Sequence, residues 1–213
     1  MTDYRLFNIR VLAVLCSLLS GCVSDSPRNF STIDRSQIQT LEFDEEIVFP
    51  NEMNFYALKR PLNPRYSSYQ LSDRSEKYRV KTAMELWEVD VKAMVIAKVK
   101  ETMKNTGRFT FIDGYDALFA DAKLKVRVKQ YGFDQLTDLK DELRPTLALD
   151  LIVVQTLSSN IWLGSGKLLP ASKGNKGYTL DEYTNNWKHC LDKTWETAVN
   201  QTVSQAVKDL VSQ

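Results

Sequence analysis

The chain has 213 residues, with 28 lysines and arginines against 27 aspartates and glutamates, one histidine, three cysteines and 43% hydrophobic residues. This composition is typical of one or two globular domains, and it excludes a polytopic membrane protein and a basic nucleic-acid binder. Because His189 is the single histidine, a multi-histidine metal site is impossible and a Ser-His-Asp site would depend on His189 alone. We therefore expect a protein that is not an enzyme and that uses no metal or cofactor.

The first 21 residues have the layout of a secretory signal. Arg5 and Arg10 precede an apolar run over 11–19, and small residues then lead to Cys22. This run is shorter than the roughly 20 residues that a permanent transmembrane helix needs. The segment Leu19-Ser20-Gly21-Cys22 resembles the lipobox of bacterial lipoproteins. A short transmembrane anchor, or a plain signal peptide in which Cys22 is incidental, is the alternative.

The lipobox resemblance implies a covalent lipid anchor. The signal would be cleaved between Gly21 and Cys22, and Cys22 would carry diacylglycerol on its thiol and an acyl chain on its new amine. Several acyl chains make membrane attachment effectively permanent. Because Val23, and not Asp, follows Cys22, the resemblance implies sorting to the outer membrane, on its periplasmic face.

The mature chain is predicted to consist of a tether and one domain. Removal of 1–21 takes away two cations and one anion, so the mature chain has no net charge to attract nucleic acid. Residues 22–40 are polar and lack an apolar period, which predicts a flexible tether after Cys22. Residues 41–213 are predicted to form a single periplasmic domain. Its one cysteine, Cys190, is expected to be a small buried residue.

The first half of the domain contains one clear helix signal. We expect a strand at 47–49, ended by Pro50, and then a long irregular segment over 51–80 with one short strand. Apolar residues at helical spacing predict an amphipathic helix over 83–105, which Gly107 ends. A strand is expected directly after it, over 108–113.

The second half alternates more regularly. Residues 122–131 place Leu124, Val126 and Val128 on one face and four cations on the other, which predicts a half-buried antiparallel strand with a solvated basic face. A more deeply buried strand is expected over 147–154, with its partner over 160–168. One long amphipathic helix is expected over 180–211, because an apolar stripe runs through it at helical spacing.

These elements predict an α+β two-layer sandwich: a mostly antiparallel sheet with one mid-chain helix and a long C-terminal helix packed on one face. An exposed sheet edge, or a groove beside the terminal helix, would bind a partner. Trp87, Tyr183 and Trp187 are our candidate partner-binding residues, and the alternative for each is a place in the core.

The sequence offers two catalytic interpretations. Asp113, Asp116 and Asp121, with Glu45 or Glu46, offer carboxylates for hydrolysis, although a turn rich in Asp explains the first three better. His189 and Cys190 are adjacent on a predicted helix, so they point to different faces and cannot pair locally. We expect no catalytic residues.

The mature domain resembles the auxiliary lipoproteins of ABC-type transport systems, which serve MCE-type and paraquat-inducible lipid-transport machines. The parallels are Leu86-Trp87, the helix end Asn105-Thr106-Gly107-Arg108-Phe109, the strand AKLKVRVKQY, and the strand pair ALDLIVVQT and NIWLGSGKLL. This resemblance implies a non-enzymatic accessory subunit of an envelope-spanning transport complex. The alternative function is activation of a cell-wall synthase or of another outer-membrane assembly machine, because fold alone does not determine function.

Overall fold

The computed structural model describes residues 37–56, 74–135, 142–158, 160–185 and 188–212. The predicted signal, its cleavage position at Gly21, the lipidation site Cys22 and most of the predicted tether lie outside these residues. Among the helices that are described, none combines the length and the apolar character that crossing a bilayer requires.

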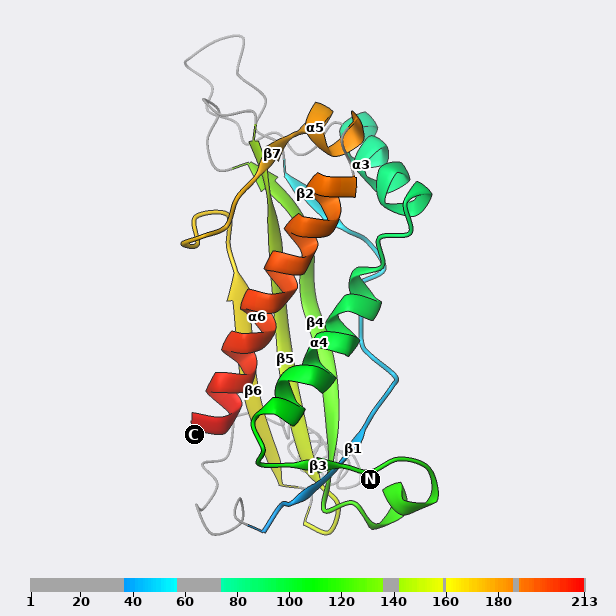
Figure 1. Ribbon diagram of the computed structural model, residues 1–213, viewed down its shortest axis with the longest axis vertical. Helices are drawn as coiled ribbons and strands as arrows, with labels where there is room; N and C mark the ends of the chain where they lie inside the picture. Colours follow the sequence, from blue (N-terminus) through cyan, green and yellow to red (C-terminus); the bar gives the residue numbers. More distant parts are fainter. Residues whose placement is uncertain (1–36, 57–73, 136–141, 159, 186–187, 213) are drawn as a thin grey trace, which may run out of the picture.

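In the part of the chain that the structure describes, a mixed sheet of seven strands forms one layer of the domain (Figure 1). Its centre is an antiparallel set of three long strands, β4 (Ala122–Gln135), β5 (Glu142–Gln155) and β6 (Ile161–Leu168). The short strands β1 (Thr40–Phe43) and β2 (Asn54–Tyr56) both pair with β4 in parallel. β3 (Thr110–Phe111) joins β1 in parallel, and β7 (Tyr178–Thr179) pairs antiparallel with the start of β5.

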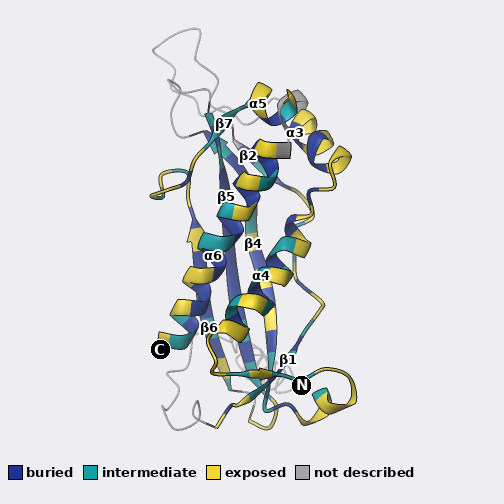
Figure 2. Cartoon of the chain, viewed as in Figure 1, coloured by how far each residue is buried: buried dark blue, intermediate teal, exposed yellow. Residues whose placement is uncertain are grey.

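Two helices form the second layer, on one face of this sheet. They are α4 (Val91–Asn105) and α6 (Lys193–Ser212), which pack beside each other with their buried faces toward the strands (Figure 2). The predicted α+β sandwich with helices on one face is thus confirmed. The sheet is mixed and not purely antiparallel, because the short strands β1, β2 and β3 all pair in parallel.

The first strand lies earlier than predicted. β1 occupies 40–43, whereas residues 47–49 contribute only a single bridge between Val48 and Arg127. Ile38, within the predicted tether, is already buried. The sequence pattern did not reveal this strand, because Leu41 and Phe43 are its only apolar side chains among the polar residues of 37–43. Both point into the core.

The predicted helix over 83–105 is two helices. α3 (Arg74–Leu86) lies largely within the segment expected to be irregular, and it ends before α4 begins. Val89 N donates to Met84 O and Glu88 N to Glu85 O, which is the Schellman pattern of a helix end. Asp90 then caps α4 by accepting a hydrogen bond from Ala93 N at 2.9 Å. The apolar period continues across the break, so periodicity alone did not reveal it.

β4 begins as predicted and continues beyond the predicted end. Leu124, Val126 and Val128 are buried, which confirms the inward face. A bulge lies between Val128 and Gln130. Its extra residue shifts the alternation of inward- and outward-facing side chains by one position, so that Phe133 also faces the core.

The long C-terminal helix is interrupted. α5 (Leu180–Asn185) is a separate short helix, and a π-helical turn η2 (Lys188–Asp192) precedes α6. The predicted stripe is nevertheless buried at every described position: Tyr183, Leu191, Trp195, Ala198, Thr202, Ala206 and Leu210.

The free edge of β6 is closed by α6. Ser165 N donates to Asp209 Oδ2 at 2.9 Å and Lys167 N donates to Gln205 Oε1 at 3.0 Å. These two donors of the edge strand are therefore occupied, which disfavours the predicted addition of a partner strand there.

Candidate functional site

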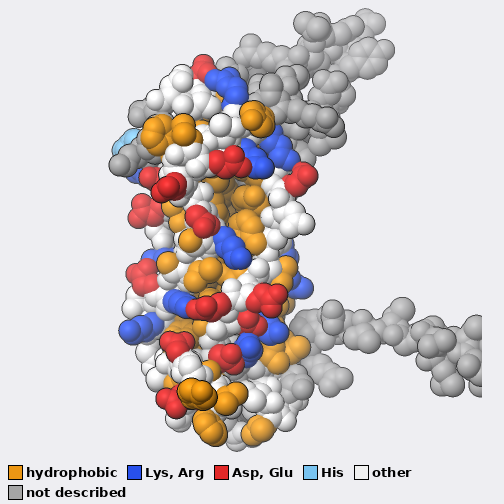
Figure 3. All heavy atoms as spheres, turned by 90° about the vertical axis from the view of Figure 1, so that its right-hand side faces the viewer, with side chains coloured by type: hydrophobic (Ala, Val, Ile, Leu, Met, Phe, Trp, Pro, Cys, Tyr) orange, Lys and Arg blue, Asp and Glu red, His pale blue; other side chains and the backbone are white. Residues whose placement is uncertain are grey.

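A groove of about 410 Å³ lies where α3 meets α4, beside the connection from β1 to β2. Its floor is apolar and comes from four separate segments: Phe49, Met53, Met84, Val89, Val91 and Tyr131. Its rim consists of exposed charged residues of both signs: Lys81, Glu85, Glu88, Asp90 and Lys92. Figure 3 shows apolar side chains between charged ones on this face of the molecule.

The helix break creates the groove. Glu88 has a left-handed backbone with φ of 55°, which turns the chain out of α3 and brings Val89 down against the core. Because α4 starts again at Val91 under the cap of Asp90, the two helix ends form one wall. The connection from β1 to β2, which supplies Phe49 and Met53 of the floor, lies on the other side of the groove.

An aromatic cluster joins the groove floor to the core. The rings of Phe49 and Tyr131 have centroids 4.6 Å apart, and Tyr131 lies 6.3 Å from Trp195 of α6. Phe133 continues the cluster at 5.2 Å from Trp195 and 4.9 Å from Tyr183. Burial, aided by the negative charge of Glu52, raises the pKa of Tyr131, so its hydroxyl stays neutral at physiological pH.

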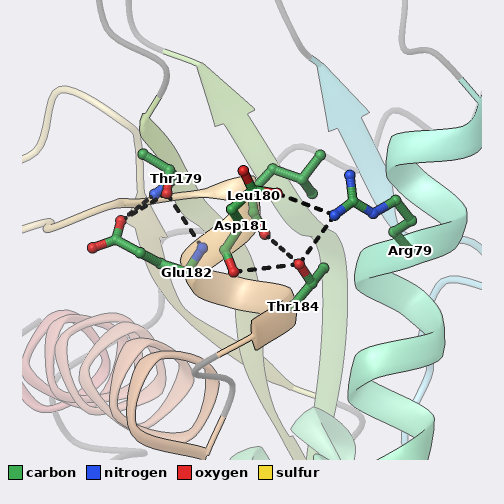
Figure 4. A network of polar contacts seen from close by, with 6 residues as sticks. All are labelled: Arg79, Thr179, Leu180, Asp181, Glu182 and Thr184. Carbon is green, nitrogen blue, oxygen red and sulfur yellow. Dashed lines mark hydrogen bonds and ion pairs between the residues drawn. The ribbon is translucent and has the colours of Figure 1, made fainter.

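α3 is linked to α5 by one arginine. Arg79 Nη2 donates to Asp181 Oδ1 at 3.1 Å and to Thr184 Oγ1 at 3.2 Å (Figure 4). α5 itself begins with a capping box, in which Glu182 Oε2 accepts from Thr179 N at 2.7 Å while Glu182 N donates to Thr179 Oγ1. Because exposed ion pairs contribute little stability, this contact links α3 to α5 but does not by itself hold α3 in place.

Comparison with known proteins gives only distant likenesses. No protein-family model matches the sequence, and no curated protein matches it. Eleven chains of solved structures match, among them two that align over most of the chain.

The first is the crystal structure of a Xanthomonas campestris protein of family DUF330, with 10% identity and a TM-score of 0.45 over 83% of this chain and 86% of that one. The second is a hypothetical protein of Chlamydia trachomatis, with 7% identity and a TM-score of 0.33 over 79% of this chain and 98% of that one.

The three candidate partner-binding residues have different surroundings. Trp87, at the end of α3, is 38% exposed and is the immediate neighbour of the rim residue Glu88. Tyr183 is fully buried and its hydroxyl donates to Leu143 O at 3.0 Å, which corrects its assignment to a contact surface and gives it the alternative place in the core. Trp187 lies outside the described residues.

The carboxylates considered for hydrolysis are either bonded to other groups or exposed. Asp121 accepts hydrogen bonds from Gln39 N and Thr40 N, and these bonds lower its pKa. Glu45 pairs with Lys100 at 3.3 Å, on the side of α4. Asp113 and Asp116 are exposed at the 3-10 helix η1 (Gly114–Phe119).

His189 and Cys190 point apart as predicted. His189 is exposed, whereas Cys190 is buried and burial raises the pKa of its thiol. Within the described ranges, no three His, Cys, Asp or Glu side chains form a group that would hold a metal ion.

The cations on the basic face of β4 pair with carboxylates whose position the sequence did not predict. Arg127 and Lys129 both bind the carboxylate of Asp150, at 2.8 Å and 2.7 Å. Lys123 and Lys125 both lie 3.8 Å from Asp44. The four cations therefore form ion pairs across neighbouring strands, which disfavours this face as a site for an anionic partner.

Proposed function

We propose that this chain is a lipid-anchored accessory protein of the bacterial envelope that docks on an ABC-type lipid-transport complex and is not itself an enzyme. The observation that carries the proposal is the lipobox, Leu19-Ser20-Gly21-Cys22, which follows a charged region and a short apolar run. Acylation of Cys22 would hold the domain at the periplasmic face of the outer membrane.

The groove supplies a docking surface of suitable chemistry. An apolar floor of six side chains would bind the apolar residues of a protein segment. The rim carries two lysines and three acids, of which Lys81 and Glu85 pair with each other at 3.5 Å, and it would offer a partner charges of both signs. This mixture favours a protein segment over a ligand of one charge. Trp87 stands beside the rim, where a large aromatic side chain would extend the contact.

The anchor is tested first. In cells fed labelled palmitate, the wild type should incorporate label and the mature protein should begin at an acylated Cys22. Cys22→Ser should abolish the label. Cys190→Ser, which removes the other cysteine of the mature chain, should leave it unchanged. Label retained by Cys22→Ser would overturn the anchor.

The partner is tested with photo-crosslinkers in intact cells. Crosslinkers at the rim positions Glu85 and Lys92 should capture an ABC permease or an MCE-domain protein, identified by mass spectrometry. Crosslinkers at Lys173 and Lys176, on an exposed loop away from the groove, are the matched controls. Capture of a peptidoglycan synthase from the rim, with no transporter component, would replace the transport role by the alternative function.

A further inference from the structure

Four large apolar side chains are exposed at one end of the sheet. Three belong to the 3-10 helix η1: Tyr115 is 91% exposed, Leu118 77% and Phe119 82%. The fourth, Leu157, is 96% exposed and lies in the turn between β5 and β6. We call these four residues the apolar tip. Keeping four such side chains in water has a free-energy cost that a binding partner would remove.

The two loops of the apolar tip lie side by side. Thr156 N donates to Asp121 O at 2.9 Å, and Thr156 Oγ1 donates to Ala120 O at 2.7 Å. These bonds join the residue before Leu157 to the residues that follow Phe119. η1 and the β5–β6 turn both lie at the lower end of Figure 1, and Figure 3 shows apolar side chains gathered at that end.

The chain from Cys22 enters the domain at the same end. β1 begins at Thr40, and Leu41 pairs with Ala122, the first residue of β4. Fifteen residue steps separate Cys22 from residue 37, because 37 − 22 = 15. A random coil of fifteen residues has a typical end-to-end distance of about 20 Å. The opposite end of the sheet is about 45 Å away, since β4 and β5 each have 14 residues.

We infer that the apolar tip inserts into the interface of the membrane that holds the Cys22 acyl chains. This inference rests on the proposed lipid anchor and adds an orientation to it. Phe, Leu and Tyr side chains are suited to the boundary between headgroups and acyl chains. The charged residues beside them, Asp113 and Asp116, are acidic, so apolar burial and not attraction to anionic lipid drives the contact.

In this orientation the groove stays accessible. The groove is lined by residues of α3, the start of α4, the β1–β2 connection and β4. The apolar tip lies at the end of the sheet where β4 begins. The tip would therefore contact the membrane while the groove faces the periplasm, where a partner would reach it.

The test uses the full lipidated protein in phosphatidylcholine vesicles. In a Cys190→Ala background, an environment-sensitive fluorophore is attached at Leu118→Cys, and in a second sample at Lys176→Cys in the exposed loop 173–177. The probe at 118 should emit at shorter wavelength and should be quenched severalfold more by nitroxide-labelled lipid than the probe at 176. Equal emission and equal quenching at the two positions would overturn the inference.

A second comparison tests whether the apolar side chains cause the insertion. Adding Phe119→Ser and Leu157→Ser should at least halve the quenching at 118. Val48→Ser with Tyr78→Ser, which removes two apolar side chains exposed elsewhere, should leave it unchanged. The mass of the N-terminal peptide is measured on each sample. Absence of acyl chains on Cys22 would overturn the proposed function, whereas acylation without preferential quenching at 118 would overturn this inference alone.

Discussion

Thr40 and Asp121 are hydrogen-bonded in both directions. Thr40 N and Thr40 Oγ1 donate to the Asp121 carboxylate at 2.8 Å and 2.9 Å, and Asp121 N donates to Thr40 Oγ1 at 3.0 Å. Gln39 N adds a further donor to the same carboxylate at 2.9 Å. The short strand β1 and the long strand β4 are thus joined where each begins, by two residues that are 81 positions apart in the sequence.

Asp121→Asn should loosen the start of β1. Gln39 N, Thr40 N and Thr40 Oγ1 all donate to one oxygen, Asp121 Oδ2. An amide oxygen in that place would lack the negative charge that strengthens the three bonds. We expect a loss of about 1–2 kcal/mol in the free energy of unfolding at pH 7, measured by urea denaturation. Because hydrogen bonds from Gln39 and Thr40 lower the pKa of Asp121, the carboxylate's contribution is present above its unfolded value of about 3.9 and is lost as the pH falls through the lowered value. Asp116→Asn, in exposed η1, is the control and should have little effect.

Gly166→Ala should displace α6 from the sheet. A Cβ at Gly166 would lie 2.0 Å from Thr202 O, and one at Gly164 would lie 2.3 Å from Ala206 O, so the helix backbone itself would have to move. We expect a loss of about 3 kcal/mol for either substitution, seen as a lower urea midpoint. Lys167→Ala, on the exposed face of β6, should change stability by less than about 0.5 kcal/mol. A wild-type midpoint for Gly166→Ala would contradict the tight packing.

The sequence predicted those elements in which local pattern and final burial agree. The alternation through Leu124, Val126 and Val128 and the stripe through Trp195 and Leu210 are both buried as expected. It could not predict the break after α3, because Glu88 adopts a conformation that glycine usually supplies and no glycine marks it. It also could not predict that Asp150, in a strand rich in apolar residues, would bind cations of the neighbouring strand.

The groove was beyond prediction for a different reason. Phe49, Met53, Met84 and Tyr131 come from separate segments, and each looks like an ordinary core residue in its own surroundings. Only the topology brings them together, because β1 and β2 run along β4 in parallel and carry their connection past the end of α3. Among the candidate partner-binding residues chosen from the sequence, Trp87 is the one that lies near the groove.

Asp150→Asn should lower stability at neutral pH and flatten its dependence on pH. Asp150 is 1% exposed, and Ser165 Oγ donates to it at 2.8 Å in addition to Arg127 and Lys129. Burial by itself raises the pKa of Asp150, but hydrogen bonds from Lys129, Arg127 and Ser165 together outweigh burial and hold it below its ordinary value. The unfolded chain therefore binds more protons as the pH falls below about 5, and stability decreases there.

We expect Asp150→Asn to lose about 2 kcal/mol at pH 7, because two half-exposed cations lose their buried partner. The difference from the wild type should narrow between pH 5 and pH 2, measured by urea denaturation at each pH. Asp113→Asn, which is exposed, should keep the wild-type profile. A constant difference at all pH values would show that the charge of Asp150 has no part in the effect.

Glu88→Gly should stabilise the protein. At φ of 55° the Cβ of Glu88 is crowded by its own backbone, and glycine adopts this conformation without that cost. We expect a gain of about 1 kcal/mol in the free energy of unfolding, as a rise in the urea midpoint. Glu85→Gly provides the opposite control, because Glu85 lies within α3, where glycine costs about 1 kcal/mol. Both residues are exposed rim residues of the groove, so the two variants remove the same charge. Glu85→Gly also removes an exposed ion pair with Lys81, which adds little to the expected loss. A loss of stability in both would show that Glu88 holds the helix end by its side chain and not against a backbone penalty.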